Sequence, residues 1–220
     1  MPTSSTIFPD NDGVVYKFAT DTWANIRNAS SGTLNVTASY YIQNSHSTGR
    51  GGNTYQIGRY FLEFDTSSIN KTISSATLNL YGYSSGTLDV ILMKGTQHSP
   101  VGTTDFNNID GVATPLSNSD GSGAGTMAII GIEPYSPEVA TWSTSGYNEI
   151  TLSDFAKADI IANDSFKCVL IGHDYDYFDI APSSQTYRTG FRTDAYSGTS
   201  SDPKLVITEQ DNSVFFGCNF

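Results

Sequence analysis

Hydrophobic and polar side chains alternate along much of this chain with a repeat of two residues. Tyr60, Leu62 and Phe64 alternate with a phenylalanine and a glutamate, and residues 76–83 show the same alternation. Successive side chains of a strand point to opposite faces of its sheet, whereas those of a helix repeat every 3.6 residues. Both segments are therefore predicted to be β-strands.

Similar segments recur at short intervals, separated by turns rich in glycine and serine. Many short strands with such turns are typical of a β-sandwich or jelly roll. The predicted strands are residues 14–18, 23–27, 33–38, 55–64, 76–83, 87–94, 127–132, 148–152, 167–172, 187–192 and 204–208.

One helix is predicted at residues 155–161, where apolar side chains follow helical spacing and Ser153 or Asp154 can cap the start. Residues 1–209 are therefore expected to form one all-β domain, a jelly-roll-like β-sandwich with one short helix. Residues 44–54 and 110–126 are predicted to be surface loops, because both are polar and rich in glycine.

The last eleven residues, 210–220, follow the final predicted strand and form a separate C-terminal tail. Most tails fray, but this one is rich in large apolar side chains. It is predicted either to pack on its own domain or to dock on a neighbouring protein. The docking residues would be Val214, Phe215, Phe216 and Phe220.

The composition supports an all-β fold and limits the partners. The 220 residues include 13 Tyr and 12 Phe, and the net charge is −11. Strands are enriched in aromatic residues. An acidic surface repels phosphate backbones, so nucleic acid is excluded as a partner. The charge also disfavours polyanionic sugars, unless a few arginines cluster in the fold.

The sequence contains two cysteines and no recognisable targeting or membrane segment. Cys168 lies in a predicted buried strand and is expected to be a buried thiol, while a disulfide with Cys218 stays open. No run reaches the roughly 18 apolar residues of a membrane span. The first residues lack the basic and apolar regions of a signal peptide, so we expect synthesis in the cytoplasm without one.

Residues 173–179 form the densest group of chemically active side chains. On an extended strand, Asp174 and Asp176 would share one face, and Tyr175 and Tyr177 the other. Three functions fit: a cation site, paired carboxylates for glycoside hydrolysis, or a sugar platform that includes Trp142. A solvated acidic loop is the simpler interpretation, and we favour it over hydrolysis.

Two further motifs have simple structural interpretations. Asp10 and Asp12 precede a glycine as in a calcium loop, but the downstream glutamate is missing, which favours an Asx turn over a structural calcium ion. Residues 82–86 match G-x-S-x-G, but a strand follows instead of the required helix. Residues 83–87 are predicted to form a hairpin turn, with Gly86 at positive φ. Trp23 is predicted to be a core residue.

Three segments together resemble the DNRLRE-type β-sandwich module. Residues 59–69 resemble its R-x-x-L-x-F-D-x-S-x-I pattern, residues 76–81 its A-x-L-x-L-Y pattern, and residues 191–208 its closing block. Glu63, Thr66 and Asp194 depart from the family's usual residues. The resemblance implies a jelly roll without catalytic residues, of a kind that includes carbohydrate-binding modules and phage structural proteins.

These observations predict a non-enzymatic protein with no cofactor. The leading hypothesis is a virion-associated structural subunit, such as a phage capsid decoration or tail-associated protein, located in a virion or extracellular assembly. Its partners would be other protein subunits. The alternative is a carbohydrate-binding module that recognises a polysaccharide through Trp142, Tyr175 and Tyr177. Fold alone does not decide between these functions.

Overall fold

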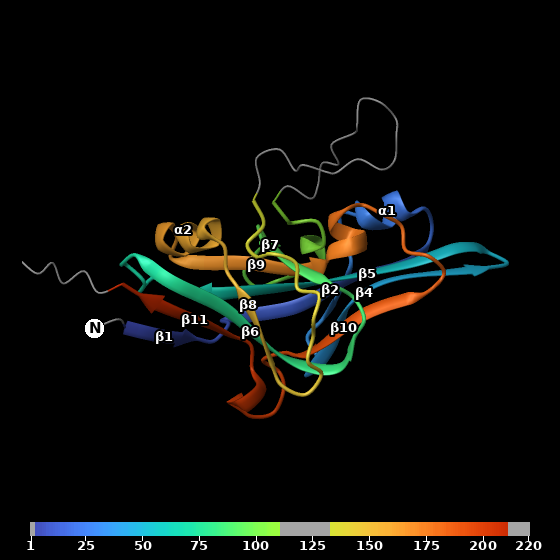
Figure 1. Ribbon diagram of the computed structural model, residues 1–220. Helices are drawn as coiled ribbons and strands as arrows, with labels where there is room; N and C mark the ends of the chain where they lie inside the picture. Colours follow the sequence, from blue (N-terminus) through green and yellow to red (C-terminus); the bar gives the residue numbers. More distant parts are fainter. Residues whose placement is uncertain (1–2, 111–132, 211–220) are drawn as a thin grey trace, which may run out of the picture.

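A computed structural model describes residues 3–110 and 133–210 (Figure 1). The chain forms strands β1 (Thr3–Ile7), β2 (Asn11–Thr20), β3 (Thr33–Asn35), β4 (Ser39–Gly49), β5 (Gly52–Asp65), β6 (Ile73–Gly86), β7 (Val90–Lys94), β8 (Tyr147–Thr151), β9 (Ser165–Gly172), β10 (Thr186–Arg192) and β11 (Lys204–Glu209). The helices are α1 (Trp23–Arg27) and α2 (Asp154–Ala162), with short helical turns η1 (Thr103–Asp105), η2 (His173–Tyr177) and η3 (Thr199–Ser201).

The strands build two antiparallel layers that are joined where β6 pairs with β10. The first layer has the order β1-β11-β6-β8. The second layer contains the strands β10-β4-β5-β2-β3 in that order. In the same layer, β9 pairs with β5 on one side and with β7 on the other. The protein is therefore an all-β sandwich, as its alternating sequence predicts.

The main hydrophobic core fills the space between the two layers. Leu78 and Leu80 of β6 face inward from the first layer, and Ile42, Tyr60 and Leu170 contribute from the second. All of these side chains are buried. Because alternate residues enter this core, the intervening residues of β4, β6 and β10 point to the outside of the sandwich.

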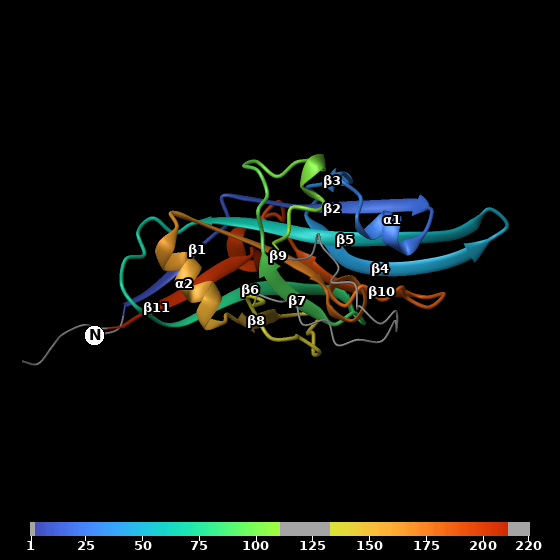
Figure 2. The same cartoon turned by 90° about the horizontal axis from the view of Figure 1, so that it is seen from above.

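A second core covers the opposite face of β2, β5, β9 and β7. Ile57 and Phe61 of β5 pack there against Trp23 and Ile26 of α1 and against Phe106. Figure 2 shows α1 over this part of the sheet. β5 is therefore buried on both faces, which explains why the sequence from Tyr60 to Phe64 is almost continuously hydrophobic.

The strand predicted at residues 23–27 is wrong, because this segment forms α1. The side chain of Thr22 accepts a hydrogen bond from the backbone N–H of Asn25 and so caps the helix. Trp23 and Ile26 are buried on one helical face. Trp23 is a core residue, as predicted. The helix expected near residue 155 is confirmed as α2, with Ser153 as its cap.

The loop predicted at residues 44–54 is also wrong, because these residues form the end of the β4–β5 hairpin. Residues 47–53 are polar because they are exposed on both faces of the hairpin, and Gly52 adopts a φ of 115° beside the tip. The hairpin extends beyond the rest of the sandwich in Figure 1, at the right of the view.

The hairpin turn predicted at residues 83–87 is wrong, because the strands on its two sides do not pair with each other. β6 continues to Gly86 and pairs with β10, whereas β7 pairs with β9. The positive φ belongs to Ser84, at 60°, rather than to Gly86.

Several predicted features fall partly or wholly outside the described residues: the strand at 127–132, most of the 110–126 loop, Cys218, and the tail residues Val214, Phe215, Phe216 and Phe220. Cys168 is a buried thiol in β9, as predicted. Within the described ranges, no helix is long and apolar enough to cross a membrane.

Candidate functional site

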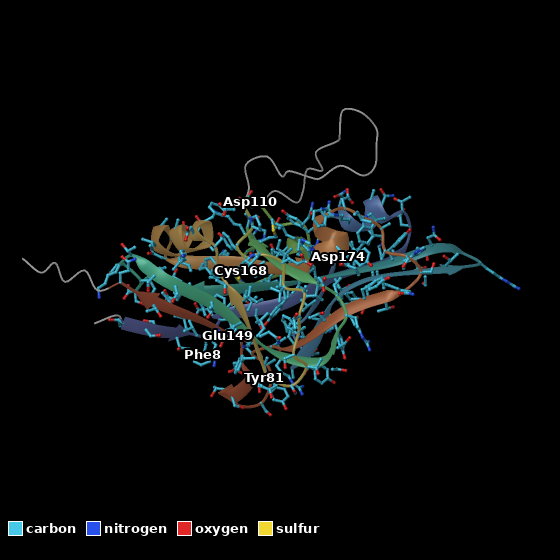
Figure 3. All side chains as sticks on the ribbon, viewed as in Figure 1. Phe8, Tyr81, Asp110, Glu149, Cys168 and Asp174 are labelled. Carbon is cyan, nitrogen blue, oxygen red and sulfur yellow. The ribbon has the colours of Figure 1, made fainter. Side chains whose placement is uncertain are left out.

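The acidic and aromatic residues after β9 form the π-helical turn η2 rather than an extended strand. The expectation that Asp174 and Asp176 share one face is therefore wrong: Asp174 is exposed, whereas Asp176 is fully buried. Figure 3 places Asp174 near the surface of the molecule. Single π-helical turns often occur at functional sites.

Asp176 forms a buried ion pair with Arg59 of β5. Nε and Nη2 of Arg59 donate to the two carboxylate oxygens of Asp176, each at 2.8 Å. Nε of Arg27 donates to the backbone carbonyl of Asp176 at 2.7 Å. Bidentate pairing of this kind fixes both partners. Asp176 therefore holds α1, β5 and η2 together and is not placed to bind a solvent-exposed ligand.

The three residues of the predicted sugar platform make different contacts. The ring centroid of Tyr175 is 4.7 Å from that of Tyr187, and Tyr177 stacks on His173 at 5.7 Å. Trp142 is half-buried, and its Nε1 donates to the carbonyl of Gly190 at 2.9 Å. Among the described residues no ring contact joins Trp142 to either tyrosine. Whether any of the three binds sugar stays a prediction.

Of the predicted turn, Asp10 lies in a bend just before β2, whereas Asp12 lies within the strand itself. Asp12 is buried in β2, where it accepts hydrogen bonds from the hydroxyl of Tyr60 and from the backbone N–H of Asp194. Burial, with the neighbouring carboxyl of Asp194, raises the pKa of Asp12 to about 7. Asp12 therefore serves as an internal contact between β2 and the segment after β10.

A group of tyrosines and arginines lies on the outer face of β4, β10 and β6. Their core-facing neighbours, such as Ile42 and Phe191, point inward. β10 pairs with β4 along its length and with β6 at two positions, so side chains from all three strands meet over β10. We call this the tyrosine–arginine face; its members are Tyr41, Tyr83, Arg188, Arg192 and Tyr196.

Both arginines lie against aromatic rings. The guanidinium of Arg188 is 4.7 Å from the ring centroid of Tyr41. The guanidinium of Arg192 lies 4.2 Å from the centroid of Tyr83 and 4.1 Å from that of Tyr196. Cation–π contacts of this kind orient the planar guanidinium groups. The donors of both arginines are thus held at the surface in defined positions.

Gly190 makes this arrangement sterically feasible. A Cβ atom at this position would lie 2.0 Å from the backbone oxygen of Tyr83 and 2.9 Å from the ring of Tyr41. The glycine therefore lets the Tyr41 ring, which is 6.0 Å from the Tyr83 ring, lie over β10 between the two arginines.

Neither arginine of this face has an acidic partner within the described part of the chain. The ion pairs formed by arginines there involve Arg27 and Arg59, which are buried. Arg188 is exposed, whereas Arg192 is half-buried and donates from Nη1 to the hydroxyl of Ser39. The chain carries 22 acidic residues against 11 basic ones, so two surface arginines without carboxylate partners among the described residues stand out. Their donors can bind an external anion, while the tyrosines offer flat faces to a ring.

Part of this face could have been found in the sequence. Arg188 and Arg192 are four residues apart in a predicted strand, which places them on the same side. Tyr41, however, reaches them only through the register of β4 on β10. No family model and no curated protein matches this chain. The resemblance to the DNRLRE-type module therefore stays a prediction.

Proposed function

We propose that this protein is a non-enzymatic binding module that holds an acidic polysaccharide on the tyrosine–arginine face. The observation that carries this proposal is the pair Arg188, which is exposed, and Arg192, which is half-buried. Both stack on tyrosines, and neither pairs with a carboxylate of the described residues. An acidic protein of this kind can bind a polyanionic sugar only where arginines cluster, and these two arginines form such a cluster.

The chemistry of the face suits a charged sugar better than a neutral one. Sugar rings present apolar faces that pack on aromatic side chains. A carboxylate or sulfate group on the same ring can accept paired hydrogen bonds from a guanidinium group. Because the protein's net charge is −11, a polyanion would be repelled elsewhere and bind mainly where the arginines lie.

The proposal is for binding rather than hydrolysis. Glycoside hydrolases need two carboxyl groups that flank the bond to be cleaved, about 5 to 10 Å apart. Asp176 is fully buried and paired with Arg59, so it cannot act with Asp174 as such a pair.

Affinity electrophoresis in gels that contain polygalacturonate, dextran sulfate or uncharged dextran tests this function. We expect the acidic polymers to retard the protein and uncharged dextran to leave its mobility unchanged. Arg188→Ala and Arg192→Ala should each weaken retention about 10- to 100-fold, because each removes a charge-assisted hydrogen bond worth about 1.5–3 kcal/mol. Arg50→Ala is the matched control, since Arg50 is exposed at the tip of the β4–β5 hairpin.

Two results would contradict the proposal. One is the absence of retardation by any acidic polymer. The other is an equal loss of retention in Arg50→Ala and Arg192→Ala, which would show that only the overall charge matters. If Tyr175→Ala or Trp142→Ala abolished binding instead, the alternative platform predicted from the sequence would be supported.

A second candidate function is that of a structural subunit in a virus particle. The observation that favours it is the β4–β5 hairpin, which extends beyond the sandwich as an arm (Figure 1). Phe18, which is 62% exposed, lies on β2 beside this hairpin. An apolar side chain next to a projecting arm suits contact with another subunit.

Quantitative mass spectrometry of gradient-purified particles tests the second function. A fixed, near-integer ratio of this chain to the main shell protein would support it, and Phe18→Ser together with deletion of residues 214–220 should then reduce incorporation. Recovery of the protein only in the free fractions would rule out a particle subunit and leave polysaccharide binding as the function to test.

A further inference from the structure

A histidine and two carboxylates meet where η2 packs against the segment before β8. One ligand atom each from Glu138, His173 and Asp174 lies within 4.8 Å of the others. Nδ1 of His173 is 3.5 Å from Oε1 of Glu138 and 3.0 Å from Oδ1 of Asp174. At these distances, one ion can contact an imidazole nitrogen and two carboxylate oxygens at the same time.

Backbone contacts hold these residues in place. Val139, next to Glu138, forms a two-way bridge with Val90, with N···O distances of 2.8 and 3.2 Å. The backbone N–H of His173 donates to the carbonyl of Asp89 at 2.8 Å. The imidazole ring lies nearly parallel to the Tyr177 ring, at an angle of 13°. The histidine is therefore oriented by contacts that do not involve the two carboxylates.

Asp89 adds a third carboxylate to the group. The carboxyl group of Asp89 lies beside those of Glu138 and Asp174. Within the described residues, no lysine or arginine forms an ion pair with any of the three acids. A divalent cation at this position would offset two of the three negative charges.

We propose that Glu138, His173 and Asp174, with Asp89 beside them, bind a divalent transition metal ion of the zinc class. The imidazole decides the class of metal: Zn²⁺, Co²⁺ and Ni²⁺ accept mixed nitrogen and oxygen ligands, whereas Ca²⁺ and Mg²⁺ prefer sites built from oxygen alone. The bound ion would link η2 to the strand segment that contains Val139. This site is separate from the tyrosine–arginine face, and its test does not depend on polysaccharide binding.

Isothermal titration of the untagged full-length protein with zinc chloride tests the proposal, with calcium chloride as the comparison. We expect one equivalent of Zn²⁺ to bind and to raise the thermal unfolding midpoint. His173→Ala and Glu138→Gln should each weaken Zn²⁺ binding about tenfold or more, since even changes outside the ligand shell cost about 10- to 100-fold. Circular dichroism checks that both variants are folded.

His98→Ala is the matched control. His98 also pairs with an aspartate, Asp105, at 2.7 Å, but it belongs to no three-residue group of metal ligands in the described structure. Its substitution should leave Zn²⁺ binding unchanged.

Three results would overturn the proposal. The wild-type protein could fail to bind Zn²⁺. Binding could survive unchanged in His173→Ala. Ca²⁺ could bind as tightly as Zn²⁺ and without dependence on His173, which would identify a nonspecific acidic patch.

Discussion

Buried charges at single positions explain how the second core is fixed. Arg59 lies on β5 with no exposed surface, and both oxygens of the Asp176 carboxylate accept its hydrogen bonds. Its remaining donors reach the backbone carbonyls of Phe106 and Arg27. One side chain therefore joins four separate segments of the chain. A buried charge is tolerated only when it is paired in this way.

Removing Asp176 should strongly destabilise the protein. In Asp176→Ala, Arg59 would keep its charge but lose its carboxylate partner, and breaking one side of a buried ion pair costs about 3–5 kcal/mol. We expect the free energy of unfolding, measured in urea, to fall by about that amount. Asp174→Ala is the control because Asp174 is exposed, and it should change stability little. Equal effects of the two variants would contradict the assigned role of Asp176.

At the scale of elements, features that depend on local alternation were predictable from the sequence, whereas features that depend on pairing between distant segments were not. Alternation is local, so β5, β6 and β11 were predictable from their own residues. The β4–β5 hairpin was missed because an arm that is exposed on both faces has no hydrophobic alternation. α1 was misassigned because it has only five residues, too few to show a helical repeat, although the three-residue spacing of Trp23 and Ile26 places them on one face of a helix and on opposite faces of a strand.

The candidate sites depend on pairing between distant segments, which alternation does not specify. Tyr41 meets Arg188 because Gly190 of β10 is opposite Tyr41 of β4. Glu138 meets His173 because Val139 bridges to Val90, 49 residues earlier, while His173 donates to the backbone carbonyl of the adjacent Asp89. The sequence identified His173 and Asp174 as a chemically active segment but gave no reason to select Glu138.

The contact between β2 and the segment after β10 should make stability depend on pH. The pKa of Asp12 is about 7 in the folded protein, against an ordinary value of 3.8. Between about pH 4 and pH 7, the folded protein therefore retains a proton that the unfolded chain has released, so stability falls as the pH rises through this window.

Asp12→Asn should remove this component of the pH dependence, because an amide resembles the protonated carboxyl group. Thermal unfolding at pH 5 and pH 8 measures it: the midpoint of the variant should fall less over this interval than that of the wild type. Asp10→Asn, at an exposed position two residues earlier, should behave like the wild type. A wild-type-like decline in Asp12→Asn would show that other groups set the pH dependence.

At the scale of the whole molecule, β5 joins the two hydrophobic cores. Tyr60 and Leu62 face the core between the layers, and Phe61 faces the core under α1. The strand pairs with β4 at one end and with β9 at the other, while β2 accompanies it along most of its length. Loss of either core would expose one face of this strand, so the cores should unfold together.

The two tryptophans provide a test, because Trp23 belongs to the second core and Trp142 packs against the first. Trp142→Phe leaves Trp23 as the only indole, and Trp23→Phe leaves Trp142. In each variant, unfolding in urea followed by tryptophan fluorescence should have the same midpoint as unfolding followed by circular dichroism. A fluorescence transition that precedes the other in either variant would show that one core unfolds independently.

Because the side chains of the tyrosine–arginine face point outward, proteins that share this architecture can diverge in what they bind. Tyr41, Arg188 and Arg192 alternate with residues that fill the core, but they do not fill it themselves. Substitutions among them can alter ligand preference while the packing beneath stays intact. New specificities could therefore arise on this surface one side chain at a time, without passing through unfolded intermediates.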